Sequence, residues 1–135
     1  MENPEINKYV VFEILESEGI ENYDDVKEFI DDVKEFGCKI AIDDFGTGYS
    51  NFQHIMKLNV DYIKIDASMT KYIDKDKNSQ LITSIIADFA KKLGIKTISE
   101  FVSSEDIYNK VKELGVDYSQ GYYFGEPKSL LVEKK

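Results

Sequence analysis

Short apolar runs and longer amphipathic stretches alternate along this chain of 135 residues. The apolar runs, which are typical of strands, occur at 9–14, 39–43, 61–66, 95–100 and 118–124. Apolar residues at helical spacing predict helices at 22–36, 52–56, 81–93 and 103–114. The polar segment 74–80 is interpreted as a solvated loop, and Ser103 with Asp106 as a capping box. No linker, low-complexity segment or short repeat divides the pattern, so we expect one domain.

This alternation predicts parallel strands joined by right-handed crossovers. Both a doubly wound sheet and a (β/α)8 barrel satisfy that pattern, but polar residues follow or close each of the five strands, and barrel enzymes collect their chemistry at this end of the strands. A complete barrel takes about 250 residues. We therefore predict the C-terminal portion of a TIM-type (β/α)8 barrel, about five β/α units. Its two open strand edges predict self-association.

Four carboxylates occupy predicted strand ends: Glu13, Asp43, Asp44 and Glu100. Neighbouring side chains on a strand alternate in direction, and a buried carboxylate is costly unless it is paired. Hard oxygen ligands of this kind suit Mg²⁺ or Mn²⁺, and two such ions can drive a displacement at phosphorus. Each residue also has a structural alternative. Asp43 and Asp44 could form a turn and a helix cap, Glu13 a solvated acidic loop, and Glu100 an exposed surface position.

Lys64 lies two residues before Asp66, so both side chains are expected on the same face of a strand. An ammonium there could hold a nucleophilic hydroxide or offset the charge of a phosphate. A structural ion pair between Lys64 and Asp66 is the alternative. Gly46 and Gly48 follow the paired aspartates and allow a sharp turn with a close approach to a ligand.

Composition narrows the possible functions. The net charge of −9 gives no basic footprint for a polymeric nucleic acid, and an acidic protein that binds a phosphate ester needs metal ions. No apolar run reaches the roughly 18 residues of a membrane span, and no secretory signal is visible. Cys38, the single cysteine, is interpreted as a buried hydrophobe in a reducing cytoplasm. His54, the single histidine, is interpreted as a surface or packing residue.

The motifs resemble those of the EAL-domain cyclic di-GMP phosphodiesterases. The matching pieces are FEILESE, IAIDDFGTGYSNFQHIMKLNVDYIKID, KTISEFV and GVDYSQGYYFGEP, which together run from about residue 10 to residue 127. The combination of DDFGTGYS with DYIKID is highly specific. The resemblance implies a (β/α)8 barrel that linearises cyclic di-GMP to pGpG with two Mg²⁺ or Mn²⁺ ions. It identifies residues 1–135 as a partial EAL domain that lacks the N-terminal strands with the E-A-L motif.

The resemblance also implies roles for the metal ligands. Glu13 is similar to a ligand of the first ion, Asp43 to the bridging ligand, and Asp44 and Glu100 to ligands of the second ion.

Other positions resemble residues that support the reaction. Lys64 and Gln120 resemble the lysine and the glutamine near the nucleophilic water. Glu16 resembles a glutamate that steadies the aspartate-bearing loop, and this loop, 44–50, takes part in dimerisation in many members. We therefore expect a homodimer or a higher assembly.

Three departures from the family pattern keep a second function open. Phe101 replaces a glycine, Ser103 replaces a glutamate, and Glu126 stands where a basic residue is common. The first hypothesis is part of an active phosphodiesterase that has little or no activity as this chain alone. The second is a degenerate module that binds cyclic di-GMP or dimerises without catalysis. A Mg²⁺-dependent enolising barrel is a third, but it does not account for DDFGTGYS.

Overall fold

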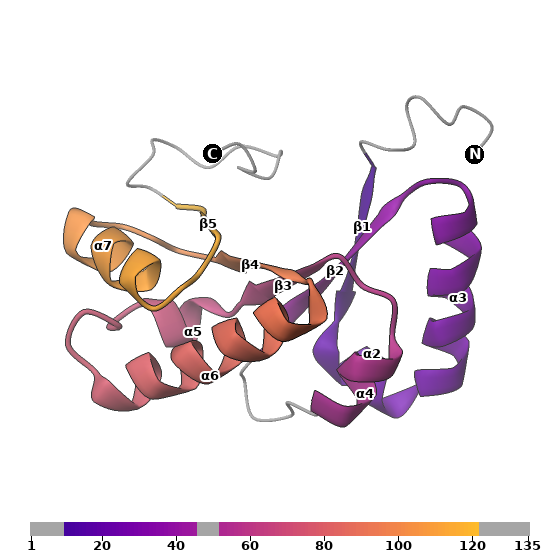
Figure 1. The fold of residues 1–135 in the computed structure, drawn as a ribbon, viewed down its shortest axis with the longest axis horizontal. Helices are drawn as coiled ribbons and strands as arrows, with labels where there is room; N and C mark the ends of the chain where they lie inside the picture. The colour runs from indigo at the N-terminus through magenta and orange to yellow at the C-terminus, as the bar shows by residue number, and fades with distance from the viewer. Residues whose placement is uncertain (1–9, 46–51, 122–135) are drawn as a thin grey trace.

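Five parallel strands form one continuous sheet in the computed structural model, which describes residues 10–45 and 52–121 (Figure 1). The spatial order of the strands is the same as their order in the chain. The strands are β1 (Val11–Leu15), β2 (Lys39–Phe45), β3 (Tyr62–Ile65), β4 (Lys96–Ser99) and β5 (Tyr118–Ser119). The sequence predicted all five strands, but the fifth was predicted too long: Gln120 and Gly121 lie outside β5, and residues 122–124 lie outside the described part.

Six helices are described within these residues. They are α2 (Glu16–Glu21), α3 (Tyr23–Glu35), α4 (Phe52–Lys57), α5 (Ala67–Thr70), α6 (Lys77–Leu93) and α7 (Glu105–Glu113). At least one helix lies in every crossover, and each crossover advances the chain by one strand in the same direction. A doubly wound sheet reverses its strand order at a switch point, whereas a barrel does not. The strand order therefore confirms the prediction of a partial α/β barrel.

The hydrophobic core lies between the sheet and its helices. Ile40 and Ile42 of β2 and Ile63 and Ile65 of β3 are completely buried, as is Ile30 of α3. Because side chains alternate along a strand, Lys64 points to the opposite face of the sheet from its two isoleucine neighbours. The isoleucines of β3 thus pack against the helical layer, while the Lys64 ammonium lies on the opposite face of the sheet.

Two helix starts differ from the prediction. The third predicted helix begins at Lys77, four residues earlier than expected, because the Asp76 carboxylate accepts hydrogen bonds from the Asn78 amide at 3.1 Å and the Ser79 hydroxyl at 2.8 Å. The last helix is capped by Ser104 and not by Ser103, since the Ser104 hydroxyl accepts from the Ile107 amide at 3.2 Å.

The short helices α2 and α5 were missed by the sequence analysis. Helix α2 has the sequence ESEGIE, with a single large apolar residue, and α5 spans only four residues, so neither shows a periodic apolar pattern. The start of α5 is set by Asp66, whose carboxylate accepts from the Ser68 amide at 2.8 Å.

Two aspartates fix the register of the sheet at the amino ends of its strands. Asp61 accepts from the Ile40 amide at 2.9 Å and pairs with Lys34 at 2.8 Å. Asp117 accepts from the Thr97 amide at 2.9 Å, and its own amide donates to the Thr97 hydroxyl at 3.1 Å. Both aspartates stand in the same tripeptide, Val-Asp-Tyr, directly before β3 and β5. This short recurrence is a repeat that the sequence analysis did not find.

Replacing Asp61 with alanine should destabilise the fold. The substitution leaves the buried Ile40 amide and the partly buried Lys34 ammonium without their acceptor, which costs about 1–3 kcal/mol. Urea unfolding should show a lower midpoint with an unchanged slope. The control is Asp88→Ala, an exposed position of α6, which should change the free energy of unfolding by less than about 0.5 kcal/mol. Equal stability of the two variants would contradict the role given to Asp61.

Candidate metal centre

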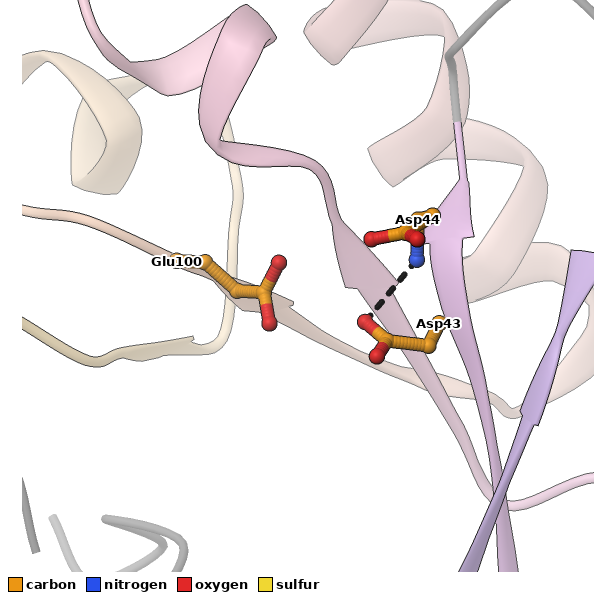
Figure 2. Close-up of side chains that lie close together, drawn as sticks. All are labelled: Asp43, Asp44 and Glu100. Carbon is orange, nitrogen blue, oxygen red and sulfur yellow. Dashed lines mark hydrogen bonds between the residues drawn. The ribbon is translucent and has the colours of Figure 1, made fainter.

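The end of β2 shows how two adjacent aspartates come to lie at one site. Asp44 has a φ of 57°, in the left-handed region, and the pairing of β2 with β3 shifts its register between Ile42 and Phe45. Such an irregularity redirects a side chain that strict alternation would send to the other face. The Asp44 amide donates to the Asp43 carboxylate at 2.9 Å, and Figure 2 shows both carboxylates on the same side of the strand end.

Glu100 completes a group of three carboxylates. It directly follows β4, and its amide donates to the Ile65 carbonyl of the neighbouring strand at 3.3 Å. In Figure 2 its side chain extends toward the two aspartates from the opposite side of the site. Asp43, Asp44 and Glu100 each offer one oxygen, and these oxygens lie within 4.8 Å of one another. The structure thus brings together three of the four carboxylates that the sequence analysis selected.

Lys64 joins this group to the fourth carboxylate, Glu13. The Lys64 Nζ atom lies 3.0 Å from Glu13 Oε2 and 3.3 Å from Glu100 Oε2. Only 6% of the Lys64 side chain is exposed, compared with 40% for Glu13. Glu13 therefore contacts the ammonium from the solvent side and stays outside the group of three.

Asp66 does not form the ion pair with Lys64 that was one interpretation of the sequence. Among the residues that the structure describes, Lys64 forms ion pairs with Glu13 and Glu100, whereas Asp66 caps α5. The Asp66 carboxyl also shares a hydrogen bond with the Asp44 carboxyl. The cap sequence Asp-Ala-Ser at 66–68 was the signal that could have indicated this position.

The electrostatics of the site favour an added cation. Burial, followed by the negative charge of Asp43, raises the pKa of Glu100 to about 7 against the opposing effect of Lys64. Burial and the charge of Asp43 also raise the pKa of Asp44. Burial alone would lower the pKa of Lys64, but its hydrogen bond with Glu13 and the charge of Glu100 raise it instead. One ammonium thus faces an excess of carboxylates that resist ionising together.

Burial also affects Asp66. Its pKa is lowered, because hydrogen bonds from Ser68 outweigh the effect of burial. Asp66 therefore accepts the hydrogen bond that it shares with Asp44 and adds further negative charge beside the site.

The remaining predicted residues fall into two groups. Gln120 directly follows β5, and its buried Oε1 atom has no hydrogen-bond partner within the described part of the chain. Glu16 begins α2 and is buried, with 2% of its surface exposed. Gly46, Gly48 and Glu126 lie outside the described residues, as does the side chain of His54. Cys38 is buried, as predicted.

The donor set fits a hard divalent cation. Carboxylate oxygens from two strand ends come within 4.8 Å of one another, and Mg²⁺ and Mn²⁺ prefer oxygen ligands of this kind. The buried Oε1 atom of Gln120, at the end of the next strand, is a further acceptor that requires a partner such as water. We conclude that Asp43, Asp44 and Glu100 can hold a divalent cation.

A cavity of about 300 Å³ lies at the other end of the strands. Its lining includes Val60, two residues before β3, and Ile95, directly before β4. The cavity is therefore separate from the carboxylates, which follow the carboxyl ends of the same sheet. No helix among residues 10–45 and 52–121 is long and apolar enough to cross a membrane.

Comparison with known proteins identifies relatives of this chain. The sequence model of the EAL domain matches residues 2–127. The cyclic di-GMP phosphodiesterase PdeF of Escherichia coli is 35% identical over 122 residues, which are 90% of this chain and 16% of that protein. The cyclic di-GMP phosphodiesterase PdeB of Shewanella oneidensis is 34% identical over 121 residues, 90% of this chain and 14% of the relative.

Solved structures agree with this assignment. The PaMucR phosphodiesterase in complex with cyclic di-GMP superimposes with a TM-score of 0.84 at 28% identity, covering 90% of this chain and 49% of that one. The manganese and cyclic di-GMP complex of Klebsiella pneumoniae BlrP1 has a TM-score of 0.84 at 29% identity, with coverages of 90% and 31%. This chain thus spans half or less of each protein that it matches here. Sequence motifs, strand order and both comparisons agree that the chain belongs to the EAL domain family.

Proposed function

We propose that this chain carries part of the catalytic centre of a metal-dependent phosphodiesterase that hydrolyses cyclic di-GMP to pGpG. The observation that supports this most is the convergence of Asp43, Asp44 and Glu100 beside a buried lysine. The names of its relatives point to the same substrate, since PdeF and PdeB are described as cyclic di-GMP phosphodiesterases. Solved relatives that hold this nucleotide with manganese or with calcium support the need for a divalent cation.

The carboxylates take the role of metal ligands in this proposal. Asp43 would hold both Mg²⁺ or Mn²⁺ ions, Asp44 and Glu100 would hold one of them, and Glu13 would hold the other. When bound, the ions supply Lewis acidity at the phosphodiester and neutralise charge that develops during displacement. The carboxylates must be ionised to do this, and the raised pKa of Glu100 means that protons compete with the cation at its carboxylate below about pH 7.

Lys64 acts through its positive charge. Its raised pKa keeps the side chain protonated at neutral pH, so it cannot serve as a general base there. Glu13 and Glu100 hold the ammonium in place, and it donates hydrogen bonds to the attacking water or to a phosphate oxygen. In the hydrolysis, a water molecule loses one proton as its oxygen bonds to phosphorus, one P–O ester bond breaks, and the leaving oxygen takes up one proton, so that the protons balance. Gln120 supports the attacking water, and Glu16 supports the aspartate-bearing loop.

We further propose that this site is incomplete within the chain. The five strands correspond to the C-terminal part of a (β/α)8 barrel, and the chain contains no E-A-L motif. A two-ion reaction needs its full ligand set for both charge neutralisation and geometry. The chain alone should therefore turn over little or no substrate.

The proposed nucleotide substrate and the buried free thiol of Cys38 support a location of this protein in the cytoplasm.

Replacing Asp43 with asparagine should weaken the binding of Mn²⁺ at least tenfold, because the variant removes the charge of the bridging ligand and keeps its size. Isothermal titration calorimetry of the metal-free chain with Mn²⁺ measures this. Asp88→Asn is the matched control, since Asp88 is an exposed residue of the helical layer, and it should leave the affinity unchanged. Equal Mn²⁺ affinity of Asp43→Asn and the unsubstituted chain would contradict the proposed centre.

Incubation with cyclic di-GMP and Mn²⁺, followed by chromatography, tests the reaction. We expect almost no pGpG from this chain, because ligands of the E-A-L strand are missing from it. Turnover at the rate of complete family members would contradict the proposal that the site is incomplete within this chain.

The alternative, a degenerate binding module, is favoured by the unusual Phe101 beside Glu100. It predicts that the full-length protein binds cyclic di-GMP in calorimetry and yet releases no pGpG.

We also infer that the chain self-associates. In the described part of the sheet, β1 and β5 are edges, and α6 exposes Leu81, Ile82 and Ile85 by 61%, 40% and 48%. Light scattering should give a mass above 15.5 kDa, and Leu81→Glu combined with Ile85→Glu should lower it. Lys92→Glu, on the same helix, changes the charge without removing an apolar residue and should not lower the mass. A monomer at high concentration would overturn this inference.

A further inference from the structure

Phe101, the residue that directly follows Glu100, has an unusual backbone conformation. Its φ is +65°, in the left-handed region where a bulky side chain is a genuine outlier. This explains why the family resemblance places a glycine at the same position, since glycine adopts such a conformation without a steric penalty. A phenylalanine there is strained, and strained residues of this kind cluster at ligand sites.

The surrounding backbone holds Phe101 in this conformation. On one side, the Glu100 amide donates to the Ile65 carbonyl of β3 at 3.3 Å. On the other side, the Val102 amide donates to the Gln120 carbonyl at 2.8 Å. Gly121 packs directly on the Val102 backbone, where an added Cβ would overlap the Val102 nitrogen and carbonyl oxygen. Phe101 therefore sits on a segment clamped between the ends of β3 and β5.

The ring of Phe101 is not used to fill the core. It is 41% exposed, whereas the next side chain, Val102, is completely buried. The left-handed backbone at Phe101 disfavours the fold, and a ring with this exposure offsets only part of that cost by packing. The preceding residue contributes a carboxylate to the candidate metal centre. Phe101 is thus a partly exposed aromatic residue, next in the chain to a carboxylate of the candidate centre.

We propose that Phe101 is a specificity-determining residue that stacks against a purine base of the bound nucleotide. This inference rests on the proposed function and adds a contact to the base, whereas the carboxylates contact the phosphate through cations. Aromatic rings stack on any base through its π face, and the clamped backbone lowers the entropy that the ring loses on binding. The Phe101 ring would thereby distinguish a nucleotide from a simple phosphodiester.

Three variants at Phe101 test the stacking role, with cyclic di-GMP binding in Ca²⁺ measured by calorimetry. Phe101→Leu keeps an apolar side chain and loses the aromatic face, so the affinity should fall about five- to hundredfold. Phe101→Tyr keeps the face and should bind within about threefold of the unsubstituted chain. Phe101→Gly relieves the strain, so its melting temperature should rise while its affinity falls. A purely structural role would not move these two quantities in opposite directions.

The outcomes separate this inference from the proposed function, because Mn²⁺ affinity is measured on the same variants and should not change in Phe101→Leu. If the chain binds Mn²⁺ and cyclic di-GMP, and Phe101→Leu and Phe101→Gly bind the nucleotide equally well, the stacking role is wrong and the metal centre stands. If the unsubstituted chain binds Mn²⁺ but no cyclic di-GMP, the stacking role is wrong for this chain and the metal centre stands. If it binds neither, the metal centre of the proposed function is wrong and the stacking role falls with it.

Discussion

The carboxyl end of this sheet depends on the ion pairs of the buried Lys64 ammonium. Lys64, on β3, contacts Glu13 of β1 and Glu100, which directly follows β4. These two strands lie on opposite sides of β3 in the sheet. A buried lysine without partners would lose its charge or destabilise the fold. The two carboxylates prevent this, and the ammonium in turn offsets part of their repulsion from Asp43 and Asp44.

Strain is concentrated at the same end of the sheet. Among the residues described, Asp44 and Phe101 are the two non-glycine residues with positive φ, and both directly adjoin or belong to the carboxylate group. A backbone in this region costs of order 1–3 kcal/mol at each position. At Asp44 the conformation brings a second carboxylate to the site. At Phe101 it falls on the residue that directly follows Glu100, a member of the group.

Stability and chemistry are separated along the strands. Asp61 and Asp117 satisfy backbone amides at the amino ends, where they fix which residues of neighbouring strands face one another. At the carboxyl end, the pairing of β2 with β3 departs from this register between Ile42 and Phe45, where the carboxylates of Asp43 and Asp44 come to lie beside Glu100. This division is typical of barrel enzymes, in which one face of the barrel stabilises the fold and the other carries the chemistry.

The sequence by itself determined the strands, the longer helices and the family. Apolar runs are visible locally because a buried strand needs successive apolar residues, and DDFGTGYS with DYIKID identified the EAL domain family. It also selected Asp43, Asp44, Glu100 and Lys64. It did not show α2, whose sequence ESEGIE holds one large apolar residue, or α5, which spans only four residues.

Only the tertiary structure decided which selected residues meet. Lys64 and Glu13 are 51 positions apart in the chain, and no local pattern encodes a contact over that separation. Local spacing offered Asp66 as an alternative partner of Lys64, but the Asp66 carboxylate caps α5 at Ser68 and shares a hydrogen bond with Asp44. Side chains alternate along an ideal strand, so adjacent aspartates would point to opposite faces of the sheet. The left-handed backbone at Asp44 brings both carboxylates to one site. Spacing predicts the face of an ideal strand, whereas contacts at strand ends depend on how the backbone leaves the sheet.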